Sequence, residues 1–168
     1  MLAYLMIVGA VFLRLTPHPP NFAPIAAMAL FGGSYLGKKY ALLIPLATMI
    51  VSDYFLAPTH MFHSTTFYVW GSFLISGLLG LSIRRAVKPS NIIAASFLAS
   101  LQFFLITNFG VWATGMYSRS WDGLIQSYIM GVPFFRWTLL GDLFYTGVFF
   151  GSYQLAKKVS RRVVITSI

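Results

Sequence analysis

Six apolar segments follow one another along the chain, and short polar or helix-breaking stretches separate them. They cover about residues 1–15, 22–37, 40–57, 66–83, 91–113 and 136–156. Apolar segments of about 20 residues are typical of helices that cross the roughly 30 Å of bilayer hydrocarbon. The pattern predicts an all-α fold: a polytopic membrane protein whose single domain, residues 1–168, is a compact six-transmembrane-helix bundle.

The longest connection lies between the fifth and sixth segments. Its stretch "WDGLIQSYIMG", residues 121–131, combines apolar and polar positions and has Asp122 near its start. A carboxylate is favoured at a helix N-terminus by the helix dipole. We therefore expect a short interfacial helix here, lying along the membrane surface before the sixth span begins.

Composition supports the bilayer as the solvent. Hydrophobic residues make up 58% of the chain and charged residues only 9%, whereas soluble domains carry about 25% charged residues. A soluble fold of 168 residues could not bury so much apolar surface.

The chain has no cysteine, which excludes disulfides and thiolate metal sites. The first residues, "MLAYLMIVGAVFLRL", lack a basic n-region and a cleavage site, so we interpret them as a retained helix.

The basic residues predict the orientation. Nine of the twelve fall in alternate connections and near the C-terminus: Lys38, Lys39, Arg84, Arg85, Lys88, Lys157, Lys158, Arg161 and Arg162. Since cytoplasmic loops are enriched in Lys and Arg, both termini are expected in the cytoplasm, with the chain in the plasma (inner) membrane. The formal charge of +9 does not indicate nucleic-acid binding, because no basic stripe alternates with exposed aromatic residues.

In this topology every aspartate and histidine falls in the outer half of the bundle or in the outer loops. An ionisable group within a span costs about 2.5–3.5 kcal/mol and normally faces a cavity or an oppositely charged partner. Asp53 or Asp142 could pair with Arg14 or Arg136 as structural ion pairs, or these groups could line a ligand cavity. The sequence leaves both interpretations open.

A small-molecule site needs a concave surface with aromatic walls and a few converging polar groups. The polar and aromatic residues at the outer level provide such a set. The candidate substrate-binding residues are Arg14, His18, Asn21, Asp53, His60, Asn108, Trp112, Tyr117, Arg136, Asp142 and Tyr145.

The turn "TPHPPN", residues 16–21, is expected to form a rim of that site. Its three prolines stiffen the backbone, and His18 and Asn21 would point toward the cavity. An ordinary surface turn that stops a helix is the alternative interpretation.

Small residues recur at four-residue spacing in three segments, as in helices that pack closely. They either pack the bundle internally or dock a partner membrane protein. The three sets are Ala29, Gly33 and Gly37; Ser72, Ser76 and Gly80; and Gly147 and Gly151.

Enzyme motifs are missing from the sequence. It contains no Ser-His-Asp order, HExxH, Walker A or GxGxxG pattern. His18, His60 and His63 have no Cys or Glu beside them, which argues against a metal site. We expect a protein that is not an enzyme, holds no metal and cannot hydrolyse ATP by itself; the sequence names no cofactor. An intramembrane enzyme using Asp53 or Asp142 with a histidine is the less favoured alternative.

Several long blocks carry a resemblance: "RLTPHPPNFAPIAAMALFGGSYLG", "PLATMIVSDYFLAPTH", "FFLITNFGVWATGMY", "GLIQSYIMGVPFF" and "TLLGDLFYTGVFFG". They resemble an uncharacterised family of bacterial six-helix membrane proteins that is similar to the S components of energy-coupling factor (ECF) vitamin transporters. The resemblance implies an S-component-like bundle that captures a vitamin-like small molecule from outside. It makes cobalamin the first expectation for the ligand, with His18, His60 or His63 as cobalt ligands.

The resemblance also bears on partners. S components that dock a transmembrane coupling protein with its ATPases resemble one another in an Ala-xxx-Ala stripe on the first helix. Here that helix reads "AYLMIVGAVF", and only Ala23 and Ala27, at the head of the second, have this spacing. Solitary operation is therefore an open alternative to docking. The function expected overall is substrate binding for transport; the alternative is a structural or assembly subunit of a larger membrane complex.

Overall fold

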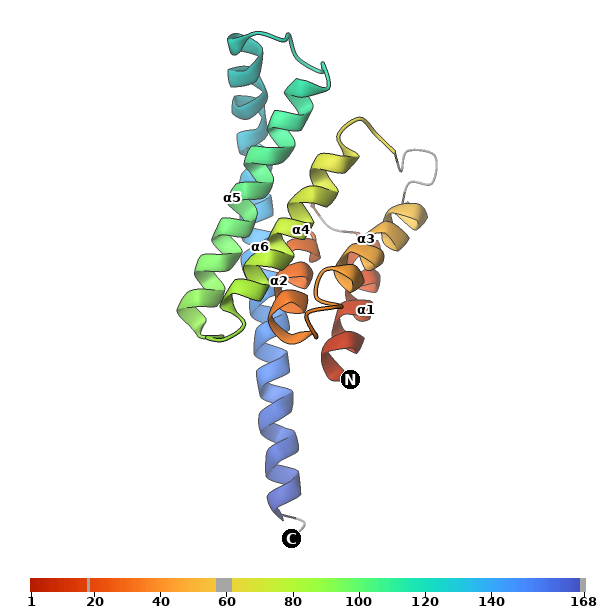
Figure 1. The fold of residues 1–168 in the computed structure, drawn as a ribbon, viewed down its shortest axis with the longest axis vertical. Coiled ribbons are helices and arrows are strands. Elements are labelled where there is room, and N and C mark those ends of the chain that lie inside the picture. Colours follow the sequence, from red (N-terminus) through yellow and green to blue (C-terminus); the bar gives the residue numbers. More distant parts are fainter. Residues whose placement is uncertain (18, 57–61, 167–168) are drawn as a thin grey trace.

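The computed structural model describes residues 1–17, 19–56 and 62–166, with side chains as far as Ser160. Within these ranges the chain is all-helical and contains no strand. The six helices are α1 (Leu2–Leu15), α2 (Ile25–Tyr35), α3 (Leu43–Leu56), α4 (Thr66–Ile83), α5 (Pro89–Ala113) and α6 (Trp121–Thr166), shown in Figure 1.

The first five helices begin and end within three residues of the predicted segments. Helix α5 begins at a proline. Pro89 lies in its first turn, where the N–H that proline lacks has no partner within the helix. Connections alternate between the two ends of the bundle. The α5–α6 connection lies at the top of Figure 1, and α3 ends and α4 begins in its upper half, whereas the α2–α3 and α4–α5 connections lie lower, toward the other end of the bundle.

The prediction of a separate interfacial helix is wrong, and so is the predicted start of the sixth helix. Residues 121–131 are the first turns of α6, which runs without interruption through Pro133 to Thr166. A proline inside a helix removes one hydrogen bond and favours a kink. Here packing of this segment against α5 compensates: the Phe104 and Phe135 rings are 4.9 Å apart, and the Tyr128 hydroxyl donates to the Leu105 carbonyl at 2.9 Å.

The core is centred on α2, whose residues 25–34 are all buried. It packs mainly against α4 and α6. The backbones of α2 and α4 touch where Gly33 meets Gly80: a Cβ built on Gly80 would lie 3.0 Å from the Gly33 Cα. At this crossing the small residues serve internal packing, as one of the two interpretations predicted. Gly147 and Gly151 on α6, by contrast, have nothing within 4 Å of an added Cβ.

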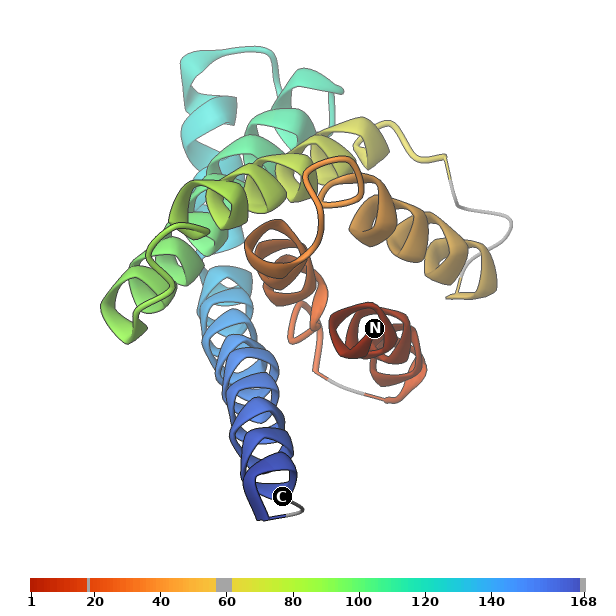
Figure 2. The same cartoon turned by 60° about the horizontal axis from the view of Figure 1, so that its bottom comes forward.

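Two helices of the described chain, α4 and α5, are long and apolar enough to cross a membrane by length and composition. Helices α1, α2 and α3 are apolar but shorter. Figures 1 and 2 show the C-terminal part of α6 extending well beyond the lower end of the bundle, on the same side as the connections that carry Lys38, Lys39, Arg84, Arg85 and Lys88.

Candidate functional site

A hollow opens between the helices of the bundle. It is made of three adjoining cavities of about 60, 260 and 520 Å³, all of which have Asn21 and Phe103 in their walls. Other residues line two of the three cavities. Thr138 lines the 60 and 260 Å³ cavities, and Phe73 lines the 60 and 520 Å³ cavities. The three cavities are therefore parts of one site, within the size range of small-molecule pockets.

Asn21 reaches the hollow because of the local backbone. It has a φ of 63°, the left-handed conformation that Asn tolerates better than most residues. The next residue, Phe22, turns the other way and lies 5.7 Å from Phe144 and 5.5 Å from Tyr145, ring centre to ring centre. Gly141 leaves room for this approach, since a Cβ there would lie 3.0 Å from the Phe22 Cα. The turn after α1 is thus packed against α6 through Phe22, and Asn21 lines the hollow.

Arg14 borders the largest cavity but is held by its neighbours. Its guanidinium forms an ion pair with Asp53 at 2.5 Å and donates to the Met49 carbonyl at 3.2 Å and to the Ser52 hydroxyl. The second Asp53 oxygen accepts from the Trp70 indole at 3.1 Å. Arg14 with Asp53 is one of the pairings that the sequence left open, and the two charges cancel within the wall.

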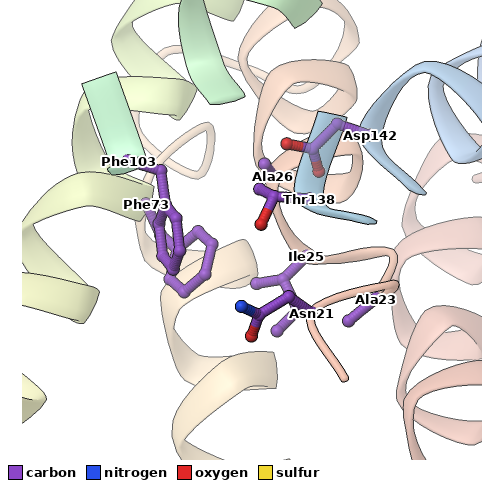
Figure 3. A pocket seen from close by; sticks show the side chains of 8 residues that line it. All are labelled: Asn21, Ala23, Ile25, Ala26, Phe73, Phe103, Thr138 and Asp142. Atoms are coloured by element: carbon purple, nitrogen blue, oxygen red, sulfur yellow. The ribbon is translucent and has the colours of Figure 1, made fainter. Parts of the chain in front are cut away.

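Asp142 lies at the deep end of the hollow. Its side chain is 3% exposed and borders the 60 Å³ cavity together with Thr138 and Asn21 (Figure 3). One carboxyl oxygen accepts a hydrogen bond of 2.7 Å from Ser100 of α5. Among the described residues Arg14 and Asp53 form the only ion pair, so no described cation balances Asp142.

The aromatic wall stands opposite Asp142. Phe73 of α4 and Phe103 of α5 have ring centres 5.3 Å apart, and Figure 3 shows both rings facing the space from one side while Asp142 and Thr138 come from the other. Sequence reasoning missed these two rings because a phenylalanine inside an apolar span gives no signal that separates a cavity wall from the core.

Asn108 borders the 260 Å³ cavity, near the crossing of α5 and α6. Its amide nitrogen donates to the Phe104 carbonyl at 2.8 Å, a bond within α5. Gly131 of α6 lies against it: an added Cβ would lie 2.8 Å from the Asn108 Cγ. The glycine therefore fixes how closely Asn108 and α6 approach each other.

Four predicted residues lie away from the described cavities. The Trp112 indole donates to the Ser118 and Ser120 carbonyls and holds the α5–α6 connection. Arg136 is exposed and stacks on Trp137 at 5.3 Å rather than pairing with Asp142. Tyr117 is half-buried, and Tyr145 packs against Phe22.

The remaining predicted residues, His18 and His60, fall outside the described residues. His63 is exposed and borders none of the three cavities. Within the described part of the chain no group of three or more His, Cys, Asp or Glu side chains could hold a metal ion.

A family model described as a family of unknown function (DUF6580) matches residues 1–164. No curated protein and no solved structure matches the chain.

Proposed function

The chain belongs to a family of unknown function (DUF6580), so its activity has to be inferred from its own geometry, and we propose that it is a membrane protein that binds a small molecule in the hollow around Asn21. The observation that carries this proposal is the convergence of three cavities on Asn21 and Phe103. The walls of these cavities are mostly apolar and carry a few polar groups, which is typical of ligand pockets.

Membrane insertion is part of the proposal. Only 9% of the residues are charged, and large apolar side chains such as Phe12, Phe67 and Phe144 are more than half exposed. Exposed apolar surface of this extent is unfavourable in water and favourable in lipid. The concentration of basic residues at the lower end then orients that end, with both termini, toward the cytoplasm of the plasma membrane. The hollow would open to the outside.

The finer form of the proposal is uptake: the protein captures a vitamin-like compound from the outer side, as an ECF S component does, and works alone or with a coupling protein and its ATPases. The cavity volumes suit a drug-sized molecule. Cobalamin stays a prediction of the resemblance, and the one described histidine, His63, lies away from the cavities.

Native mass spectrometry of protein purified from its host membrane tests the binding proposal. We expect a small molecule that co-purifies with the wild type. Val69 borders both larger cavities, so Val69→Trp should fill the hollow and abolish co-purification. The matched control is Val148→Trp, because Val148 is 42% exposed on α6 and its replacement should leave binding intact. Absence of any ligand from the wild type, together with no thermal shift across a vitamin panel, would contradict the proposal.

A structural or assembly subunit of a larger membrane complex is the second candidate. The open surface around Gly147 and Gly151 favours it, because small residues allow another helix to approach closely. Purification in mild detergent separates the two functions. Constant stoichiometric recovery with a complex unrelated to uptake, and an empty hollow, would favour the subunit.

A further inference from the structure

We propose that the ligand of the hollow is an organic cation, a protonated or quaternary nitrogen on an apolar body, and that Asp142 receives its positive charge. This inference rests on the proposed binding function and specifies the chemical class of the ligand.

The first argument is the uncompensated charge of Asp142. Its side chain is 3% exposed and receives one hydrogen bond from Ser100, and no described cation pairs with it. The ionised form of a carboxyl group in such surroundings is strongly disfavoured, so the group either stays protonated or gains a positive partner. The 60 Å³ cavity, which is part of the hollow, borders its side chain and gives a ligand access to it.

The second argument is the charge of the whole wall. Among the described residues Arg14 is the one cation that borders the three cavities, and Asp53 neutralises it within the wall. Asp142 therefore decides the sign of the site when it is ionised. A low-dielectric cavity with one uncompensated negative charge attracts cations and repels anions.

The third argument is the aromatic pair opposite. The faces of phenyl rings attract cations, most strongly where water is excluded. Phe73 and Phe103 pack on each other across the cavity from Asp142 (Figure 3), so a ligand in this space would have aromatic surface on one side and the carboxyl group on the other. Asn21 and Thr138 add an amide oxygen and a hydroxyl oxygen that can accept hydrogen bonds from a nitrogen donor.

A bare metal ion fits this wall less well. Sodium and calcium require several oxygen ligands around them, whereas Ala23, Ile25, Ala26 and the two phenylalanines supply only apolar surface. An organic cation matches both parts of the wall, with its charge toward Asp142 and its apolar body toward the rings.

Three probes with the same ring and similar chain length test the charge: phenethylamine, 2-phenylethanol and 3-phenylpropionate, which are cationic, neutral and anionic at neutral pH. Affinity for the purified full-length protein is measured by thermal shift and by competition with the co-purified ligand. We expect phenethylamine to bind about tenfold or more tightly than the other two, as hydrogen bonding to a charged group implies. Sodium chloride against potassium chloride at equal ionic strength should give no difference.

Two variants locate the preference. Asp142→Asn should abolish the advantage of phenethylamine over 2-phenylethanol. Asp122→Asn is the matched control, since Asp122 is an exposed acid on the same helix and its loss should change nothing. If Asp142→Asn does not fold, Asp142→Glu keeps the charge and should retain the preference for the amine.

The outcomes separate the two proposals. Equal binding of all three probes to the wild type would overturn the cation proposal but leave the binding proposal standing. Stabilisation of the wild type by sodium but not potassium, lost in Asp142→Asn, would have the same two consequences. Preferential binding that survives Asp142→Asn would also overturn it. A hollow that binds no probe and holds no co-purified molecule would remove the binding function itself.

Discussion

At the scale of single residues, the two carboxylates near the hollow differ in what balances them. Asp53 is bound by Arg14 and by the Trp70 indole, so all its strong interactions are made within the protein. Asp142 has one hydroxyl donor and faces open space. The first arrangement is typical of a structural tie between helices, here α1, α3 and α4, and the second of a group that meets a ligand.

Asp53→Asn tests the structural assignment. The amide can still accept a hydrogen bond from Arg14, but the partly buried guanidinium loses its counter-charge. We expect the free energy of unfolding to fall by about 1–3 kcal/mol, the cost of leaving such a group poorly satisfied. Thermal or denaturant melting in detergent measures it.

The control for this experiment removes both partners. Because replacing a whole ion pair by apolar groups costs less than breaking it, Arg14→Met combined with Asp53→Leu should recover much of the lost stability. A double variant less stable than Asp53→Asn alone would contradict a purely structural pair.

At the scale of elements, the crossing of α2 and α4 sets the position of the hollow, because α2 carries Ile25 and Ala26 and α4 carries Val69 and Phe73 into its walls. The helices meet backbone to backbone at Gly33 and Gly80, where no side chain separates them. This close approach is available only to glycine, since an added Cβ on Gly80 would meet the Leu30 carbonyl.

Gly80→Ala should therefore destabilise the bundle by about 1–3 kcal/mol through overpacking against main chain that cannot move aside. Gly71→Ala on the same helix is the control, because nothing lies within 4 Å of its added Cβ. In Gly71→Ala we expect only the effect of alanine's better helix propensity, which would raise the free energy of unfolding by up to about 1 kcal/mol. Equal melting temperatures for the two variants would show that the crossing is not tightly packed in solution.

At the scale of the whole molecule, the basic residues and the hollow lie near opposite helix ends. Arg14 and Leu56, which border the hollow, lie at the C-terminal ends of α1 and α3, whereas Lys38, Lys39, Arg84 and Arg85 follow the C-terminal ends of α2 and α4. In a membrane this arrangement would place the basic end in the cytoplasm and the hollow outside. The last turns of α6, with Lys157 and Lys158, extend past the bundle on the basic side, where they could meet anionic headgroups.

Cysteine labelling tests this orientation directly, because the chain has no cysteine of its own. Ser118, in the α5–α6 connection, and Ser90, at the start of α5, are both exposed and lie toward opposite ends. A membrane-impermeant maleimide added to intact cells should label Ser118→Cys and leave Ser90→Cys unlabelled. Both should react after permeabilisation. If only Ser90→Cys were labelled in intact cells, the protein would have the opposite topology.

The accuracy of sequence reasoning varied with the kind of contact involved. Five helices followed from apolar segments and their breakers. The sequence also suggested that an Asp of the pair Asp53 and Asp142 meets an Arg, but only the structure selected Asp53 with Arg14. The sixth helix was predicted too short because Pro133 and the polar residues before it suggest a break. Its packing against Phe104 and Asn108 of α5 overrides that local signal.

The sequence by itself determined what is local or cumulative: the apolar segments that form helices, the alternation of basic and nearly neutral connections, and the positions of acids and bases along each helix. Only the tertiary structure decided which side chains converge. It brought Phe73, Phe103 and Asp142 to one cavity, and it placed Trp112 and Arg136 outside the described cavities. The reason is physical: depth depends on position along a helix, whereas convergence depends on helix rotation and crossing, which contacts such as Gly33 with Gly80 fix between distant parts of the chain.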